Sequence, residues 1–240
     1  MREEEIVFDE EYFRSHGKGS SYGREYWHGS QRILQWFSRR LKLISDKIIK
    51  SKVVVDLGCG LAHSAHAIRM INPRLLVIAI DISEVALKRA KELYGDDEQL
   101  LFIVADAGNI PLRDNIADVV MSFETYEHLE NPVKMLKEAH RILREGGTLL
   151  VSTPNARSLP AIIYGDKWIG LSDDTHINLT TPEQLKKNLL KSGFNIVKCF
   201  THGFPILNSI EKIFNKLLIR SPLGLGAEII CIAIKDPIPT

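Results

Sequence analysis

The stretch VVVDLGCG, residues 53–60, decides the fold that the sequence predicts. Three β-branched residues in a row indicate a buried strand, because such side chains pack well in a sheet. Gly58 and Gly60 follow where the strand ends, and glycines there let the backbone turn tightly and approach a ligand closely. A helix predicted near residues 61–71 would then direct its unpaired N–H groups at that ligand.

The alternation of strand and helix continues along the chain. Strands are predicted at 52–57, 75–80, 100–105, 117–123, 148–153, 194–201 and 228–235. Helices are predicted near 30–49, 61–71, 83–94, 131–144 and 182–192. Short apolar runs separated by helices indicate a mostly parallel sheet that is covered on both faces. The predicted fold class is therefore α/β, as a single doubly wound domain.

Acidic residues end the first three predicted strands. Asp56 closes the first strand, Asp81 the second, and Asp106, followed by Ala107, the third. The carboxyl ends of parallel strands meet at one edge of a sheet, where an acid can accept hydrogen bonds from ribose hydroxyls. Any one of these residues can also cap the next helix. Taken together, they indicate a nucleoside site.

A nicotinamide dinucleotide is the main rival ligand for such a site. Its fingerprint requires a third small residue after Gly58 and Gly60, but His63 stands at that position. A bulky side chain there would keep the helix away from a pyrophosphate. The sequence therefore favours an adenosine group without a diphosphate.

Several segments together resemble the successive motifs of class I S-adenosylmethionine-dependent methyltransferases, in the broad subtype that includes quinone-biosynthesis enzymes. The segments are 56–60, 80–83, 105–107 with 110–112, 123–124 and 143–147. The resemblance covers roughly residues 50–200 and keeps the motif order. It implies S-adenosylmethionine as cofactor. It also implies a seven-stranded sheet of order 3-2-1-4-5-7-6 whose last strand, 228–235, is antiparallel.

The resemblance also implies roles for single residues in binding the cofactor. Gly58 and Gly60 would lie under its methionine part, and Asp81 would hold the ribose. Ile82 would pack on the adenine, Asp106 and Ala107 would meet the adenine amino edge, and Phe123 would sit beside the sulfonium. The full predicted set is Asp56, Gly58, Cys59, Gly60, Asp81, Ile82, Asp106, Ala107 and Phe123. Because a sulfonium methyl is already electrophilic, transfer needs mainly an aligned acceptor and a single general base.

The predicted acceptor side has residues from two distant segments. Glu124, Glu127 and His128 follow the fourth strand, and His176 lies in a long connection after the fifth. His128, His176 and Glu124 are the predicted catalytic residues, with a neutral histidine taking the acceptor's proton. Alternatively, the two carboxylates and two imidazoles bind a divalent cation, a pattern that resembles the metal set of small-RNA 2′-O-methyltransferases and of some quinone O-methyltransferases. The sequence leaves open whether a metal is needed.

Regions outside the core motifs are predicted to cover the site. Residues 1–50 are predicted to form an N-terminal cap and helix, and 51–240 the methyltransferase core, with lid insertions near 154–181 and 202–227. Long connections in a compact domain are often functional. The stretch 206–219 is amphipathic, which suits core or subunit packing, a hydrophobic-substrate lid, or peripheral membrane contact.

Composition narrows the location and the partners. Lys and Arg number 31 against 30 Asp and Glu, for a net charge of +1, so no general attraction to DNA is predicted. Three cysteines without paired spacing argue against a disulfide framework. The start is acidic and lacks the apolar run of a secretory signal, and no stretch is long and apolar enough to span a membrane. A cytoplasmic monomer or homodimer is predicted.

The predicted function is transfer of a methyl group from S-adenosylmethionine to an oxygen, nitrogen or carbon of a small molecule. Two alternatives stay open at this stage. One is a metal-assisted RNA 2′-O-methyltransferase, against which the chain shows no appended RNA-binding module. The other is a protein that binds the cofactor without catalysis.

Overall fold

A seven-stranded sheet forms the centre of the molecule, in a computed structural model that describes residues 8–15, 25–203 and 224–236. The strands lie in the order β3-β2-β1-β4-β5-β7-β6, as predicted. Their bounds are β1 Val53–Leu57, β2 Leu76–Asp81, β3 Leu100–Val104, β4 Ala117–Phe123, β5 Leu143–Pro154, β6 Phe194–His202 and β7 Glu228–Lys235. β7 runs antiparallel to β5 and β6, and the other neighbouring pairs are parallel. The predicted strand order and the antiparallel last strand are both confirmed.

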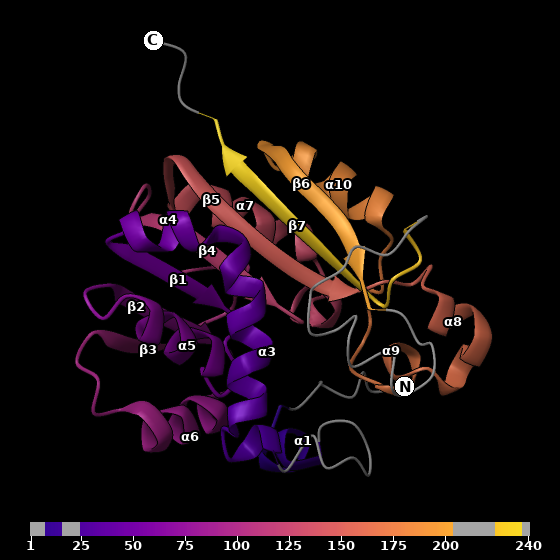
Figure 1. The fold of residues 1–240 in the computed structure, drawn as a ribbon, viewed down its shortest axis with the longest axis horizontal. Helices are drawn as coiled ribbons and strands as arrows, with labels where there is room; N and C mark the ends of the chain where they lie inside the picture. Colours follow the sequence, from indigo (N-terminus) through magenta and orange to yellow (C-terminus); the bar gives the residue numbers. More distant parts are fainter. Residues whose placement is uncertain (1–7, 16–24, 204–223, 237–240) are drawn as a thin grey trace.

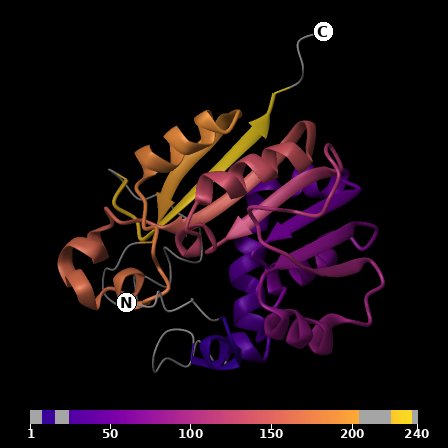
Figure 2. The same cartoon turned by 180° about the vertical axis from the view of Figure 1, so that it is seen from behind.

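Helices cover both faces of the sheet (Figures 1 and 2). One face packs against α3 (Gln31–Leu41), α4 (Ser45–Lys50), α5 (His63–Ile71) and α6 (Glu84–Tyr94). The other face packs against α7 (Pro132–Ile142) and α10 (Pro182–Lys191). Val54 and Val119 join the first apolar cluster, while their neighbours Val55 and Val120 join the second. This alternation follows from the two-residue period of a strand, and it buries the sheet on both sides.

Sequence signals set the ends of several helices. Asn131 caps α7 through its side chain with Pro132 at the first turn, and Thr181 caps α10 in the same way with Pro182. The predicted helix near 30–49 is broken into α3, a 3₁₀ turn at Lys42–Ile44 and α4, because Ile44 adopts φ −129°. The apolar face predicted for it is nevertheless buried throughout, at Ile33, Phe37, Leu41, Ile44 and Ile48.

Two features of the last strands differ from the sequence analysis. β5 begins at Leu143, before the predicted start, because Leu143 already pairs with Ala117 of β4. The register then shifts at the segment that contains Gly146, and pairing resumes at Thr148. Cys199 and Cys231 lie directly opposite each other on β6 and β7, with Cα atoms 4.1 Å apart, and are joined by a disulfide. The sequence analysis argued against a disulfide framework and did not anticipate this single pair, because spacing along the chain does not reveal which residues pair across strands.

The predicted insertions are only partly described. The connection 154–181 contains α8 (Leu159–Tyr164), a 3₁₀ turn at Gly165–Lys167 and α9 (Ile169–Ser172). Most of the second insertion, 202–227, and all of the amphipathic stretch 206–219 lie outside the described residues. Within the described part of the chain, no helix has the length and apolar character required to cross a bilayer.

The turn after β1 is packed tightly between the ends of its two neighbouring strands. The N–H groups of Gly58 and Cys59 donate to the Ile80 carbonyl at 2.9 and 3.0 Å. Gly58 has φ +67°, and a Cβ at this position would lie 2.2 Å from Thr125 Cγ2. The position therefore requires glycine both for its backbone conformation and for the space beside Thr125.

We expect Gly58→Ala to destabilise the protein more than a glycine substitution that introduces only backbone strain. Gly146 has φ +73° and open space around it, so Gly146→Ala should cost about 1 kcal/mol. Gly58→Ala adds a steric clash and should cost about 1–3 kcal/mol more. Urea unfolding of the two variants measures the difference. Equal losses would show that Thr125 moves aside without cost.

Candidate active site

Asp81 lies at the end of β2, beside the glycine turn of β1. Its Oδ2 accepts the Gly60 N–H at 2.7 Å, and its Oδ1 accepts the Ser83 N–H at 2.9 Å. The side chain is buried, and burial raises its pKa although the surrounding backbone N–H groups lower it. Each carboxylate oxygen has about two lone-pair sites, so both oxygens keep acceptor capacity for a ligand hydroxyl.

The edge beyond Asp81 contains the residues predicted to meet an adenine. Ile82 is 61% exposed although it is apolar. Asp106 is exposed, and its Oδ1 accepts the Gly108 N–H at 2.8 Å, while Ala107 next to it is buried. An exposed apolar side chain beside an exposed carboxylate can bind a flat base by its face and its amino edge.

Other residues of the predicted cofactor set lie beneath the turn. Asp56 is 1% exposed and accepts hydrogen bonds from Ser64 Oγ and the Ala65 N–H, and burial raises its pKa to about 7. Cys59 is a buried free thiol, and Phe123 packs edge to face on Phe37 with centroids 5.6 Å apart. In the structure these three side chains are buried in the core.

The N-terminal segment covers the glycine turn. A Cβ placed on Gly60 would lie 2.7 Å from the Tyr26 hydroxyl and 3.5 Å from Phe13. Phe13 belongs to α1 (Glu10–Ser15) and forms a small apolar cluster with Trp27 and Leu61. Aromatic residues predicted to cap the site therefore lie directly over its backbone.

His63 connects this cover to the sheet. Its Nε2 is 2.6 Å from the Tyr26 carbonyl, which can only accept, so we assign the ring proton to Nε2. Nδ1 then accepts from the Tyr94 hydroxyl at 2.8 Å. Burial lowers the pKa of His63 to about 4. The histidine that argued against a dinucleotide thus also anchors the N-terminal segment.

The 154–181 insertion is held against the turn that follows β4. Asn178 donates from its backbone to the Glu127 carbonyl at 2.8 Å and from its side chain to the Leu129 carbonyl. A parallel bridge between Asn155 and Thr180 closes the base of the insertion. These contacts bring two segments together that lie far apart in sequence.

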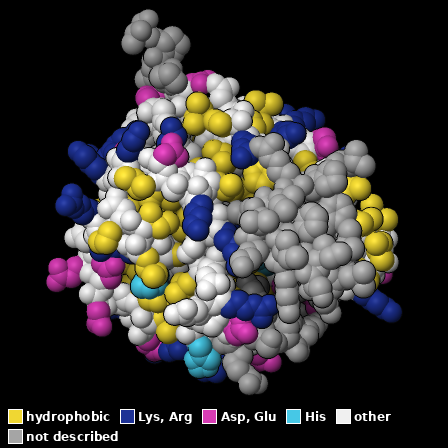
Figure 3. Space-filling model, viewed as in Figure 1, with side chains coloured by type: hydrophobic (Ala, Val, Ile, Leu, Met, Phe, Trp, Pro, Cys, Tyr) yellow, Lys and Arg dark blue, Asp and Glu magenta, His cyan; other side chains and the backbone are white. Residues whose placement is uncertain are grey.

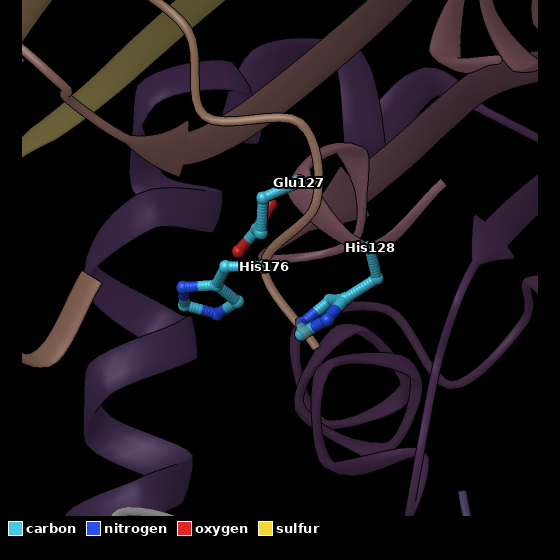
Figure 4. Close-up of side chains that lie close together, drawn as sticks. All are labelled: Glu127, His128 and His176. Carbon is cyan, nitrogen blue, oxygen red and sulfur yellow. The ribbon is translucent and has the colours of Figure 1, made fainter. Parts of the chain in front are cut away.

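The result is a cluster of Glu127, His128 and His176, shown in Figure 4. One ligand atom from each side chain lies within 4.8 Å of the other two. The predicted proximity of His128 and His176 is visible as an edge-to-face contact with ring centroids 4.8 Å apart. The rings of Phe8 and Tyr12 pack against His128 at 5.6 and 6.3 Å.

Glu124 is not a member of this cluster, although, after burial, its nearby charge is what raises the pKa of Glu127. It adopts φ +50°, which is strained for a residue with a side chain, and its Oε1 accepts from Ser152 Oγ at 3.0 Å. Burial and the nearby Glu228 raise the pKa of Glu124 to about 8, against the lowering effect of Arg40. Glu124 therefore belongs to a second group of charged residues.

That second group is centred on an ion pair between Arg40 and Glu228. Arg40 Nε donates to Glu228 Oε1 at 2.8 Å, and its Nη2 donates to Oε2. His202 Nδ1 lies 3.6 Å from Glu228 Oε2. Burial alone would raise the pKa of Glu228, but Arg40 and His202 hold it at about 2.

The sequence analysis missed Arg40, Glu228 and His202. One signal was available for Arg40, which lies three residues after Phe37 on the apolar face of its helix. An arginine at a core position needs a buried partner, because an unpaired charge is costly there. Which acid pairs with it depends on the position of β7, which local sequence does not reveal.

Comparisons with known proteins agree with this geometry. A family model described as "Methyltransferase domain" matches residues 55–151. A malonyl-[acyl-carrier protein] O-methyltransferase of Hamiltonella defensa is 31% identical over 191 residues, which cover 79% of this chain and 67% of that protein. The protein of the same name from Marinomonas sp. is 30% identical over 179 residues. The chain belongs to the class I S-adenosylmethionine-dependent methyltransferase family.

The fold of this chain also matches solved structures. A Thermotoga maritima S-adenosylmethionine-dependent methyltransferase, described as a possible histamine N-methyltransferase, superposes with a TM-score of 0.66 at 18% identity. The match covers 94% of this chain and 98% of that one. Several of the curated relatives are longer, however, and the matches with them span 43% to 65% of their length.

We expect the buried His63 to make the stability of the protein depend on pH. Because its pKa is about 4 in the folded protein and about 6.5 when unfolded, the unfolded chain takes up the proton first as pH falls. Stability should therefore be lost between about pH 6.5 and pH 4. From pH 7.5 to pH 5 the loss from this residue should be about 2 kcal/mol.

Urea unfolding of the wild type and of His63→Gln at several pH values measures this effect. The glutamine side chain is neutral throughout, so the difference between the two proteins isolates the histidine from the buried carboxyl groups. If the two stability curves run parallel from pH 7.5 to pH 5, the imidazole is not held neutral by the fold.

Proposed function

We propose that this chain transfers the methyl group of S-adenosylmethionine to a small-molecule acceptor bound beside His128 and His176. One observation supports this most strongly. Phe13 of α1 packs over the Gly60 turn, while its neighbour Tyr12 packs on His128. A single short helix thus covers both the predicted cofactor edge and the histidine cluster. Two ligands bound there would meet under one cover.

The residues at the cofactor edge fit S-adenosylmethionine. Asp81 keeps lone pairs for the ribose hydroxyls, and Gly58 and Gly60 form the turn beside which the methionine part would lie. Ile82 and Asp106 offer an apolar surface and a carboxylate for the adenine. When bound, the cofactor supplies an electrophilic methyl group. The protein's task is then to align the acceptor and exclude water.

His128 and His176 act on the acceptor side in this proposal. Both are partly buried, and both lie on connections at the carboxyl edge of the sheet, where ligands bind in doubly wound folds. We propose that Glu124 acts through other residues, as a positioning group, because it faces Ser152 and the Arg40–Glu228 pair. The N-terminal cap and the 154–181 insertion serve as the two walls of the acceptor site.

We propose an oxygen acceptor that carries an apolar part. Two relatives are named as O-methyltransferases, which favours methylation at oxygen. On the insertion, α8 exposes Ile162, Ile163 and Tyr164, which are 65%, 60% and 54% exposed. Apolar side chains over α8 are visible at the right of Figure 3. Such a surface beside a reaction site suits an acceptor with a hydrocarbon arm.

A nucleic-acid acceptor is not favoured. On the face seen in Figure 3, the basic side chains of the described residues are scattered among acidic and apolar ones. The relatives reported above are named for small or carrier-bound acceptors, and none is named for RNA 2′-O-methylation. We propose a cytoplasmic enzyme that works as a monomer or homodimer.

We expect Asp81→Asn to weaken binding of S-adenosylmethionine and of its demethylated product. The amide replaces a charged acceptor that also holds the Gly60 N–H, and this loss should cost about 1–3 kcal/mol of binding free energy. Calorimetry measures both affinities. Glu84→Gln is the matched control, since it removes the same charge from an exposed position three residues away. Unchanged affinity in Asp81→Asn would refute the cofactor site as placed.

Transfer itself is tested with methyl-labelled cofactor and a cell extract separated into lipid, small-molecule, RNA and protein pools. We expect the wild type to label the small-molecule or lipid pool. Asp81→Asn should give less label at limiting cofactor. Label found only in RNA and lost after ribonuclease treatment would favour the RNA alternative. No label in any pool, with cofactor binding intact, would favour a non-catalytic binding protein.

A further inference from the structure

The cluster of Glu127, His128 and His176 has an arrangement that acceptor binding by itself does not require. The three side chains come from a 3₁₀ turn and from a distant insertion, and their ligand atoms lie within 4.8 Å of one another. Figure 4 shows them gathered at one point. A general base needs a single imidazole, whereas here two imidazoles and a carboxylate meet.

The far side of each histidine ring is anchored to the backbone. His176 Nδ1 lies 2.9 Å from the Gly170 carbonyl, and His128 Nδ1 lies 3.2 Å from the Thr175 carbonyl. A carbonyl only accepts, and the Thr175 hydroxyl, 2.9 Å from His128 Nδ1, gives its own proton to Asp173. Each Nδ1 therefore carries the proton and each Nε2 bears a lone pair. Metal-binding histidines are typically oriented in this way, by a hydrogen bond from the nitrogen that does not bind the metal.

Glu127 adds a carboxylate oxygen that needs a partner. The residue is fully buried, and its Oε2 accepts from Thr153 Oγ1 at 3.0 Å. Its Oε1 is also buried and has no hydrogen-bond partner among the described residues. A buried carboxylate oxygen without a hydrogen-bond partner destabilises the folded protein unless a ligand binds to it.

Asp173 supplies further negative charge at the same place. Its Oδ1 accepts from the Thr175 N–H and hydroxyl, at 3.0 and 2.6 Å. Its Oδ2 lies 3.8 Å from His176 Nε2. The carboxylate is therefore fixed beside the nitrogen that presents its lone pair, where it favours a cation.

We propose that Glu127, His128 and His176 bind a divalent first-row transition-metal ion. Two imidazole nitrogens and one carboxylate suit Zn²⁺ or Mn²⁺, whereas Mg²⁺ prefers ligands that are all oxygen. Three protein ligands leave coordination positions open, as in catalytic metal sites. Glu124, which the sequence analysis included in a possible metal set, is not part of this site.

The open positions indicate what the ion does, a step that rests on the proposed function. An acceptor hydroxyl bound to the ion would lose its proton to water more readily, because the cation stabilises the negative oxygen. That oxygen would then form a bond to the methyl carbon as the bond from carbon to the cofactor's sulfur breaks. The acceptor class is then one whose methylated atom is an ionisable hydroxyl. The metal site itself does not depend on this step and is tested without an acceptor.

The test measures metal binding by the full chain. The protein is stripped with a chelator, dialysed against Zn²⁺ or Mn²⁺ in the presence of excess Mg²⁺, and analysed for bound metal, and Co²⁺ absorption reports the ligands. We expect one ion per wild-type chain. Glu127→Gln, His128→Ala and His176→Ala should each lower the affinity by at least about tenfold. If substitution of the buried Glu127 prevents folding, His176→Asn tests the site at a partly exposed position.

Two controls keep the result specific. His140→Ala removes a histidine that packs on Phe194, away from the cluster, and should bind metal like the wild type. Glu124→Gln should also keep its metal. No stoichiometric binding, or binding that survives in all the cluster variants, would overturn the proposal. Cofactor affinity measured in parallel separates the two proposals, because a chain that binds metal but not S-adenosylmethionine refutes only the function.

Discussion

The close contact between the β1 turn and the ends of its two neighbours is the constraint on which the site depends. On one side, the Gly58 N–H donates to the Ile80 carbonyl. On the other side, Thr125 lies so close to Gly58 that a side chain at this position would not fit. The Thr125 hydroxyl in turn lies 3.3 Å from the Leu57 carbonyl. Three parallel strands are thus fixed at the edge where Asp81 and His128 emerge. A displacement of this turn would therefore move Asp81 and His128 together.

A second constraint comes from charges buried beneath that edge. Arg40 is 4% exposed, and its guanidinium lies 3.2 Å from the centroid of the Trp36 ring while it binds Glu228. Breaking such a pair leaves an uncompensated buried charge, so the N-terminal helix and the antiparallel strand depend on each other. The pair also brings a fixed cation and anion close to Glu124. The neutral state of that carboxyl is thereby tied to the packing of α3 against β7.

The sequence predicted the fold well because its signals are local and repeated. Apolar runs, Pro132 and Pro182 at helix starts, and acids at strand ends each follow from the neighbouring residues alone. His128 and His176 were also predicted to meet, since both lie on connections at the same edge. The Arg40–Glu228 pair, the cysteine pair and the separation of Glu124 from Glu127 could not be predicted. Each of them depends on which strands become neighbours and on how a turn directs its side chains.

The positive φ of Glu124 shows how one turn serves both groups of charges. A single residue in the left-handed region reverses the chain at once after β4, so Glu124 faces Ser152 and the buried ion pair. The 3₁₀ turn that follows then places Glu127 and His128 on the side of the insertion. Two acidic residues three positions apart therefore enter different environments, one beside Arg40 and one beside two imidazoles. The strained backbone at Glu124 is what places these two carboxyl groups beside different partners within the same short segment.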